Sequence, residues 1–216
     1  MKEKNSLTCI KWGNFWMKNR RSYERGYLFY LLFPVIVIIL LFPFLAGLYP
    51  IVRFTEEEIN IFVHRNHIEM RGTYIYSNPL PFPVIQGMSI PLPVDLGHPH
   101  PVLLSVCEIY PESRDIPVRY ILGKHRFDLK FRPRGEVRVL VRYCQHAPKR
   151  NARYILTTTG AWRHPLDRGV YRLFPGSVKI VSSNYTLKRE ASDSLFFNKT
   201  SFMPKRDWRF SWEVKP

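Results

Sequence analysis

Histidine and cysteine side chains are the first candidates for chemistry in this sequence. His98 and His100 are separated by one proline, a spacing at which two imidazoles can share a metal ion if a third ligand comes from elsewhere. Cys144 and His146 form a second pair, which Cys107 would complete. Neither pair has the doubled spacing of a structural zinc site, so we interpret them as a proline-stiffened loop and an ordinary strand end. We expect no metal and no cofactor.

A hydrolase is the second chemistry that these residue types allow. Cys144, His146 and Asp167 would supply its nucleophile, base and orienting carboxylate. Such a set is easily found in a chain with seven histidines, and the sequence contains no nucleophile elbow, P-loop, dinucleotide fingerprint or His-Glu-x-x-His motif. The carboxylate run at residues 56–58 is interpreted as a topology and spacer element. The sequence therefore predicts a protein that is not an enzyme.

Cys107 and Cys144 are also candidates for a disulfide. Each lies in a run with the alternation of a β-strand, and both follow a predicted membrane segment, so they would meet an oxidising compartment. A bridge requires Cα atoms within about 7 Å, which a sequence does not reveal. A Cys107–Cys144 bridge and two separate thiols both remain open.

The loop at residues 160–169 carries the candidate interface. Trp162, Arg163 and His164 are of the residue types that dominate protein interfaces when they lie on a loop beside a rigid scaffold. The alternative is that Trp162 fills the end of the hydrophobic core. Asn184 and Asn198 begin glycosylation sequons, which matter only in a eukaryotic source.

One apolar segment determines which compartment these residues face. Residues 27–52 contain no charged side chain, and at about 1.5 Å per residue their most apolar part, residues 28–48, is long enough to cross a hydrocarbon core of roughly 30 Å. A buried core helix and a cleaved signal peptide are the alternatives. The length of the run and the absence of an Ala-x-Ala site favour an uncleaved transmembrane helix.

The charges that flank this segment predict its orientation. Residues 1–26 hold seven Lys or Arg and two Glu, whereas Arg53 is followed by three glutamates. The positive-inside rule places residues 1–26 in the cytoplasm, as a basic tail, and residues 53–216 outside it, in a single-pass cell-membrane protein. Of the formal charge of +16, the outer residues carry +11, which favours anionic lipid, an anionic polymer or an acidic protein as a partner over nucleic acid.

Alternating polar and apolar residues predict an all-β outer domain. The clearest elements are a hairpin over residues 59–76 and a meander over residues 118–144. Shorter strands are expected at residues 84–90, 102–109, 153–159, 170–174, 177–182 and 208–214. About ten short strands separated by Pro and Gly favour an immunoglobulin-like β-sandwich.

Two stretches carry a family resemblance. Residues 127–143 (FDLKFRPRGEVRVLVRY) and 154–166 (YILTTTGAWRHPL) resemble segments of uncharacterised bacterial single-pass membrane proteins with an immunoglobulin-like outer domain. The resemblance covers about 40 residues and implies a fold and a location, without an activity or a functional residue.

Two functions are predicted from these features. The first is a non-enzymatic accessory or interaction protein, whose basic β-sandwich docks on a membrane protein partner at the outer face of the membrane. The second is a sensor or carrier domain that binds a ligand or a polyanion there. A hydrolase or metalloprotein is the third and weakest.

Overall fold

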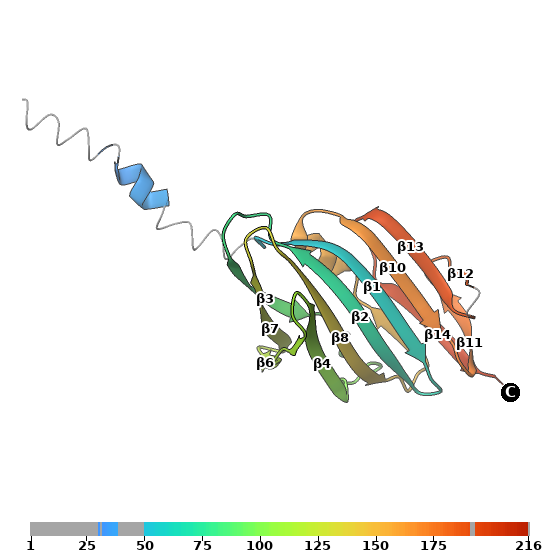
Figure 1. The fold of residues 1–216 in the computed structure, drawn as a ribbon. Helices are drawn as coiled ribbons and strands as arrows, with labels where there is room; N and C mark the ends of the chain where they lie inside the picture. The colour runs from blue at the N-terminus through green and yellow to red at the C-terminus, as the bar shows by residue number, and fades with distance from the viewer. Residues whose placement is uncertain (1–29, 31, 39–49, 191–192, 216) are drawn as a thin grey trace, which may run out of the picture. The chain divides into compact units, whose positions relative to one another are not determined.

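The computed structural model describes residues 30, 32–38, 50–190 and 193–215 (Figure 1). The chain divides into two units, residues 1–49 and 50–216. In the first unit, residues 32–38 are helical. Most of the predicted membrane segment, all of the basic tail and Cys9 lie outside the described residues. Among the residues that are described, no helix combines the length and hydropathy needed to cross a membrane.

The second unit is built on one long sheet. Its eight strands lie in the order β12-β13-β10-β1-β2-β8-β4-β5. The bounds are β1 Arg53–Val63, β2 His67–Ser77, β4 Leu103–Tyr110, β5 Arg114–Asp115, β8 Glu136–His146, β10 Leu166–Phe174, β12 Lys188–Arg189 and β13 Leu195–Phe202. Strand β2 pairs antiparallel with β1 on one side and with β8 on the other, and β1 also pairs in parallel with β10. This parallel pair joins segments more than a hundred residues apart.

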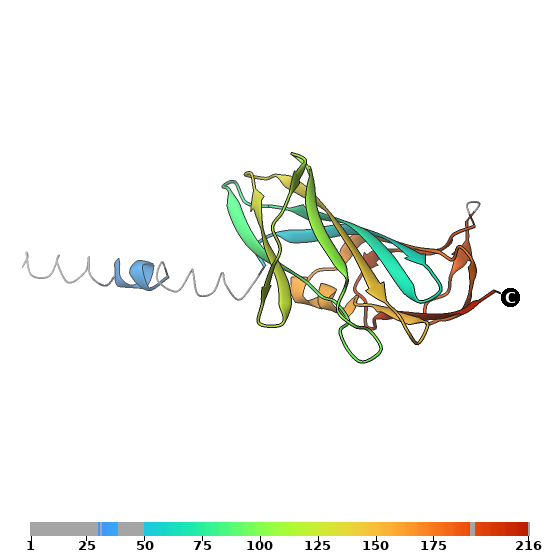
Figure 2. The ribbon, with the colours of Figure 1, turned by 90° about the horizontal axis from the view of Figure 1, so that it is seen from below.

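Two three-stranded sheets pack against the long one. The first has the order β11-β14-β9, with β9 Asn151–Tyr154, β11 Val178–Ser183 and β14 Trp208–Val214. The second has the order β3-β7-β6, with β3 Val84–Ile90, β6 Arg119–Ile121 and β7 Lys124–Phe131. A 3-10 helix, η1 at Thr157–Trp162, follows β9. Figure 2 shows β14 and η1 on the opposite side of the core from β1 and β2.

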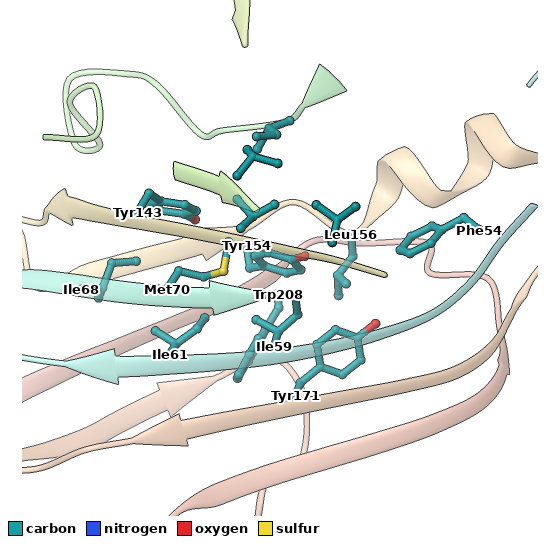
Figure 3. Close-up of a cluster of buried hydrophobic side chains, with 14 of the residues drawn as sticks. Phe54, Ile59, Ile61, Ile68, Met70, Tyr143, Tyr154, Leu156, Tyr171 and Trp208 are labelled. Atoms are coloured by element: carbon teal, nitrogen blue, oxygen red, sulfur yellow. The ribbon is translucent and has the colours of Figure 1, made fainter. Parts of the chain in front are cut away.

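The core forms because apolar residues recur at every second position of these strands. Ile59 and Ile61 of β1, with Met70 of β2, point toward Trp208 of β14 and Tyr154 of β9 (Figure 3). All five side chains are at most 8% exposed. A strand whose alternate residues are apolar gains most by turning that face toward another sheet.

The all-β prediction and the hairpin over residues 59–76 are confirmed. The meander expected over residues 118–144 is only half correct, because β6 and β7 form a hairpin but β8 pairs with β2 and β4 in the long sheet. The immunoglobulin-like sandwich is not the observed arrangement. That fold divides seven or nine antiparallel strands between two sheets. Here eight strands share one sheet that contains a parallel pair, and two smaller sheets complete the layer beneath it.

Three local expectations were wrong. The strand expected over residues 153–159 ends at Tyr154. Most of the loop expected at residues 160–169 belongs to the end of η1 and to the first residues of β10. Strand β13 was not predicted. The glutamates at residues 56–58 are not a spacer, because they lie within β1.

Candidate functional site

A pocket of about 560 Å³ lies on the outer face of the β11-β14-β9 sheet. Alternate residues of these strands turn inward, as Ala152, Phe210 and Val178 do, so the residues between them face outward. The polar residues that line the pocket are His98, Asn151, Arg153, Ser182, Ser183, Asn184, Arg209 and Ser211. The volume is within the range of about 300–1,000 Å³ that is typical of small-molecule sites.

Strand register places two cations side by side in this pocket. Arg153 of β9 is the direct cross-strand partner of Arg209 of β14. One row along, Asn151 pairs with Ser211, and Ser211 pairs with Ser182, whose hydroxyl oxygen lies 2.7 Å from that of Ser211. The sheet therefore presents a row of two guanidinium groups beside a row of an amide and two hydroxyls.

The residue 91–101 loop contributes His98 to the pocket. Asp95 and His98 close a tight turn through reciprocal backbone hydrogen bonds, and His98 Nδ1 lies 2.8 Å from Asp95 Oδ1. Hydrogen bonds from His98 and from the Gly97 N–H hold the pKa of the Asp95 carboxyl below its usual value. Gln145 of β8 anchors the loop by donating from Nε2 to the carbonyls of Pro93 and Pro99, at 2.9 and 2.7 Å.

Several buried polar atoms in the pocket have no hydrogen-bond partner among the residues that the structure describes. These atoms are His98 Nε2, Asn151 Oδ1 and Arg153 Nε. The Arg209 side chain likewise has no ion pair or hydrogen bond within the described part of the chain. Arg153 reaches only Asp95 Oδ2, at 3.5 Å. Buried polar groups in folded proteins are normally bonded, so this set makes the pocket the candidate binding site.

A buried carboxyl group forms a second polar feature, inside the core. Glu57 is 4% exposed and accepts hydrogen bonds from the hydroxyls of Tyr154, at 3.1 Å, and Tyr171. The Tyr74 hydroxyl lies 2.9 Å from that of Tyr154 and extends the network. Burial raises the pKa of Glu57 to about 7, and the two tyrosine hydrogen bonds oppose part of this shift.

A β-bulge and a glycine create the space for this network. The register of β1 against β2 shifts between Phe54 and Glu56. Before this bulge the even-numbered residue Phe54 faces the core, and after it the odd-numbered residues do, so that Glu57 is buried. Tyr171 lies flat over Gly169 of its own strand, where an added Cβ would meet the tyrosine hydroxyl at 2.6 Å. The network is enclosed between the sheets, and we assign it to the stability of the fold.

The histidine and cysteine pairs are not brought together for chemistry. His98 contacts Asp95, whereas the His100 ring packs edge-on against Tyr120, 5.9 Å between centroids. No group of three potential metal-ligating side chains occurs among the described residues. Strand register places Arg168, the neighbour of Asp167, level with Arg138, six residues before Cys144. Asp167 is therefore separated from Cys144 by three strand spacings, roughly 14 Å, across the sheet and by roughly 20 Å along it, so the proposed hydrolase triad does not form.

The proposed disulfide does not form either. Cys107 and Cys144 are both free, and they lie on the adjacent strands β4 and β8 out of register. Cys144 pairs with Leu103, four residues before Cys107, a separation of roughly 13 Å along the strand. Cys107 instead donates from Sγ to Asp115 Oδ1 at 2.9 Å.

The interface loop is divided between core and surface. Trp162 packs against Phe54 and Tyr76, with ring centroids 5.8 and 5.5 Å apart, so it covers the end of the core as the alternative expectation held. Arg163 is exposed at φ 60°, and His164 is half-buried, with Nδ1 3.0 Å from the Pro165 carbonyl oxygen. In the sequons, the Asn184 amide is bonded to the Asp207 carbonyl, whereas Asn198 is exposed.

The pocket residues on the sheet were not singled out from the sequence. In the sequence these residues are the polar positions of an alternating pattern, and any strand with one face in solvent has such positions. They are Asn151, Arg153, Arg209 and Ser211. Asn151 and Arg153 lie more than 50 residues from their partners across the sheet, Ser211 and Arg209, so no local signal joins the two strands. The alternation at residues 208–214 was the one usable sign that this face is structured.

Comparison with known proteins supports the fold alone. No protein-family model and no curated protein sequence matches the chain. Among solved structures, a candidate nutrient binding protein of Legionella pneumophila is similar with a TM-score of 0.60 and 14% identity, over 76% of this chain and 67% of that one. An M1 zinc metallopeptidase of Deinococcus radiodurans matches with a TM-score of 0.39 and 12% identity, over 74% of this chain and 42% of that one.

Proposed function

We propose that residues 50–216 form a non-enzymatic ligand-binding domain, which residues 27–52 hold at the outer face of a cell membrane. The pocket on the β11-β14-β9 sheet carries this proposal. Its unpartnered buried atoms, His98 Nε2, Asn151 Oδ1 and Arg153 Nε, form a set that a polar ligand would satisfy. The nutrient binding given for the structural neighbour is compatible with this function. The uncharged segment and its basic flank support the location.

Filling the pocket tests this function. Ser211 faces the pocket from the middle strand of its sheet, so Ser211→Trp would occupy the space where a ligand binds. Full-length protein purified in mild detergent should carry a small molecule that native mass spectrometry detects, and the Ser211→Trp protein should not. Glu213→Trp is the matched control, because Glu213 is exposed on the same strand and does not line the pocket. Equal ligand occupancy in all three proteins would refute the assignment of the pocket.

An accessory role at a membrane protein partner is the second candidate, and the β6–β7 turn favours it. Ile121 and Leu122 are 39% and 87% exposed, and Leu122 adopts a φ of 50° that a leucine rarely takes. Leu122→Asn should stabilise the turn, because Asn followed by Gly suits a turn with positive φ at both positions. Leu96→Asn is the control, because Leu96 is 98% exposed but lies outside the β6–β7 turn. If the turn contacts a partner, the Leu122→Asn protein should lose a co-purifying subunit that the wild type and the Leu96→Asn protein retain. Retention by all three would remove this candidate.

A further inference from the structure

The charges and unpaired groups of the pocket indicate which ligand it takes. Resting on the function proposed above, we infer that the pocket binds a small monocarboxylate that also carries hydroxyl or N–H donors. Its carboxylate would lie between Arg153 and Arg209, and its donors would face Asn151 and His98.

The arginine pair is the first part of the argument. Like charges directly opposite each other on neighbouring strands oppose folding, and Arg153 and Arg209 are direct partners. A carboxylate between two guanidinium groups would remove that repulsion and accept hydrogen bonds from both. Among the described strands, two other pairs of arginines face each other, Arg119 with Arg126 and Arg71 with Arg142, and one member of each bonds an acid, as Arg153 does in the pocket. The pair in the pocket differs because it lies beside buried atoms of Asn151 and His98 for which the described residues offer no hydrogen-bond partner.

The charge count selects a single carboxylate. Arg153 and Arg209 contribute two positive charges, and Asp95, 3.5 Å from Arg153, contributes one negative charge. When His98 holds a single ring proton, on Nδ1, and donates it to Asp95, one net positive charge remains for a ligand. A phosphate group carries a charge of about −1.5 to −2 at pH 7 and would leave the pocket with excess negative charge.

The unpartnered acceptors specify the rest of the ligand. Asn151 Oδ1 accepts hydrogen bonds only, and His98 Nε2 is an acceptor when Nδ1 holds the ring proton. Neither atom suits a second anionic group, and both suit a hydroxyl or an N–H. The Ser182 and Ser211 hydroxyls bond to each other and leave one hydroxyl proton free to donate. A carboxylate with neighbouring donors therefore satisfies each polar group of the pocket.

Titration of the full-length protein with matched probes tests the inference. The monocarboxylates are D-gluconate, D-galacturonate, N-acetylneuraminate and N-acetyl-L-glutamine, and the neutral counterparts are D-glucitol, D-galactose, N-acetylmannosamine and N-acetyl-L-glutamine amide. Inorganic phosphate and glucose 6-phosphate complete the set. We expect saturable calorimetric binding of at least one carboxylate, at least 10-fold tighter than its neutral counterpart and than either phosphate.

Arg209→Gln makes the test specific to the pocket. Arg209 is exposed and makes no ion pair among the described residues, so its loss should leave the melting temperature unchanged or higher while weakening carboxylate binding about 10- to 100-fold. Arg209→Lys should weaken binding less, because a single ammonium keeps the charge but not the paired donors. Arg126→Gln, which removes one member of an arginine pair outside the pocket, should bind as wild type does.

The outcomes separate this inference from the proposed function. Carboxylate binding that Arg209→Gln weakens supports both. Binding of a neutral or phosphate probe that Ser211→Trp abolishes and Arg209→Gln leaves unchanged would overturn the monocarboxylate and preserve the pocket as a ligand site. Binding by no member of the set would overturn the inference, and native mass spectrometry of wild type against Ser211→Trp would then decide the proposed function independently.

Discussion

Single residues in this protein take roles that depend on which sheet face they reach. Glu57 sits in a run of three glutamates that reads as a solvated spacer, yet the bulge in β1 turns it inward and leaves its neighbours at the surface. Glu58 pairs with Arg172 at 2.5 Å, whereas Glu57 meets only tyrosine hydroxyls. The same residue type thus faces a guanidinium group at position 58, whereas burial among tyrosine hydroxyls raises its pKa at position 57.

Glu57 makes stability depend on pH. Its pKa in the folded protein is about 7, above the ordinary value of 4.5 for a glutamate, so the folded state retains a proton that the unfolded chain releases between these two pH values. The contribution to the free energy of unfolding is therefore fully present below pH 4.5 and is lost as pH rises through 7. In urea titrations, Glu57→Gln should remove a decrease of about 3 kcal/mol between pH 4.5 and pH 8.

Glu56→Gln is the control for this measurement. Glu56 is more exposed, and its nearest cation, Arg168, is 3.8 Å away. The Glu56→Gln protein should keep the pH dependence of the wild type. Parallel stability curves for wild type and Glu57→Gln would contradict the assignment of a raised pKa to Glu57.

At the scale of elements, β14 joins the end of the chain to the core and the pocket. It is the middle strand of its sheet, between β11 and β9. Its inward residues Trp208, Phe210 and Trp212 are each at most 2% exposed, and Arg209 and Ser211 face the pocket between them. One strand thus supplies the floor of the pocket and a wall of the hydrophobic core.

A chain that ends at Asp207 should not fold. Removing three buried aromatic side chains costs about 3–5 kcal/mol each, which together approach or exceed the roughly 5–15 kcal/mol that stabilises a typical domain. Circular dichroism and a thermal melt should show no cooperative transition for this truncation. A chain ending at Val214 keeps all of β14 and should melt as the full-length protein does. A cooperative melt without β14 would contradict its central place in the fold.

At the scale of the whole molecule, the proposed function needs the pocket to be outside the cell membrane. In bacterial spheroplasts expressing the full chain, external protease should digest residues 53–216 while a tag before Met1 stays protected. The intact mass should include residues 1–52, and alkaline washing should leave the protein in the membrane fraction. A mature chain that starts beyond residue 48, or a C-terminal tag that only cytosolic reagents reach, would refute the anchor.

The local pattern of the sequence predicts much of this fold. Two-residue alternation identified the hairpin of β1 and β2, the long strand β8 and the terminal strand β14, because a half-buried strand must place its apolar residues on one face. It did not predict β13, whose outer residues are polar at several successive positions. Nor did it predict η1, because the threonines at 157–159 favour a strand and the turn depends on contacts made by Asp207.

The sequence by itself determined an all-β unit, its approximate strands and an uncharged segment ahead of them, since periodicity and charge are local properties. Only the tertiary structure decided the strand order, the parallel pairing of β1 with β10, the separation of Cys107 from Cys144 and the burial of Glu57. It also decided that Arg153 stands opposite Arg209, 56 positions later in the chain. The physical reason is that register between distant strands is set by the packing of both sheets, a property that no single stretch of sequence contains.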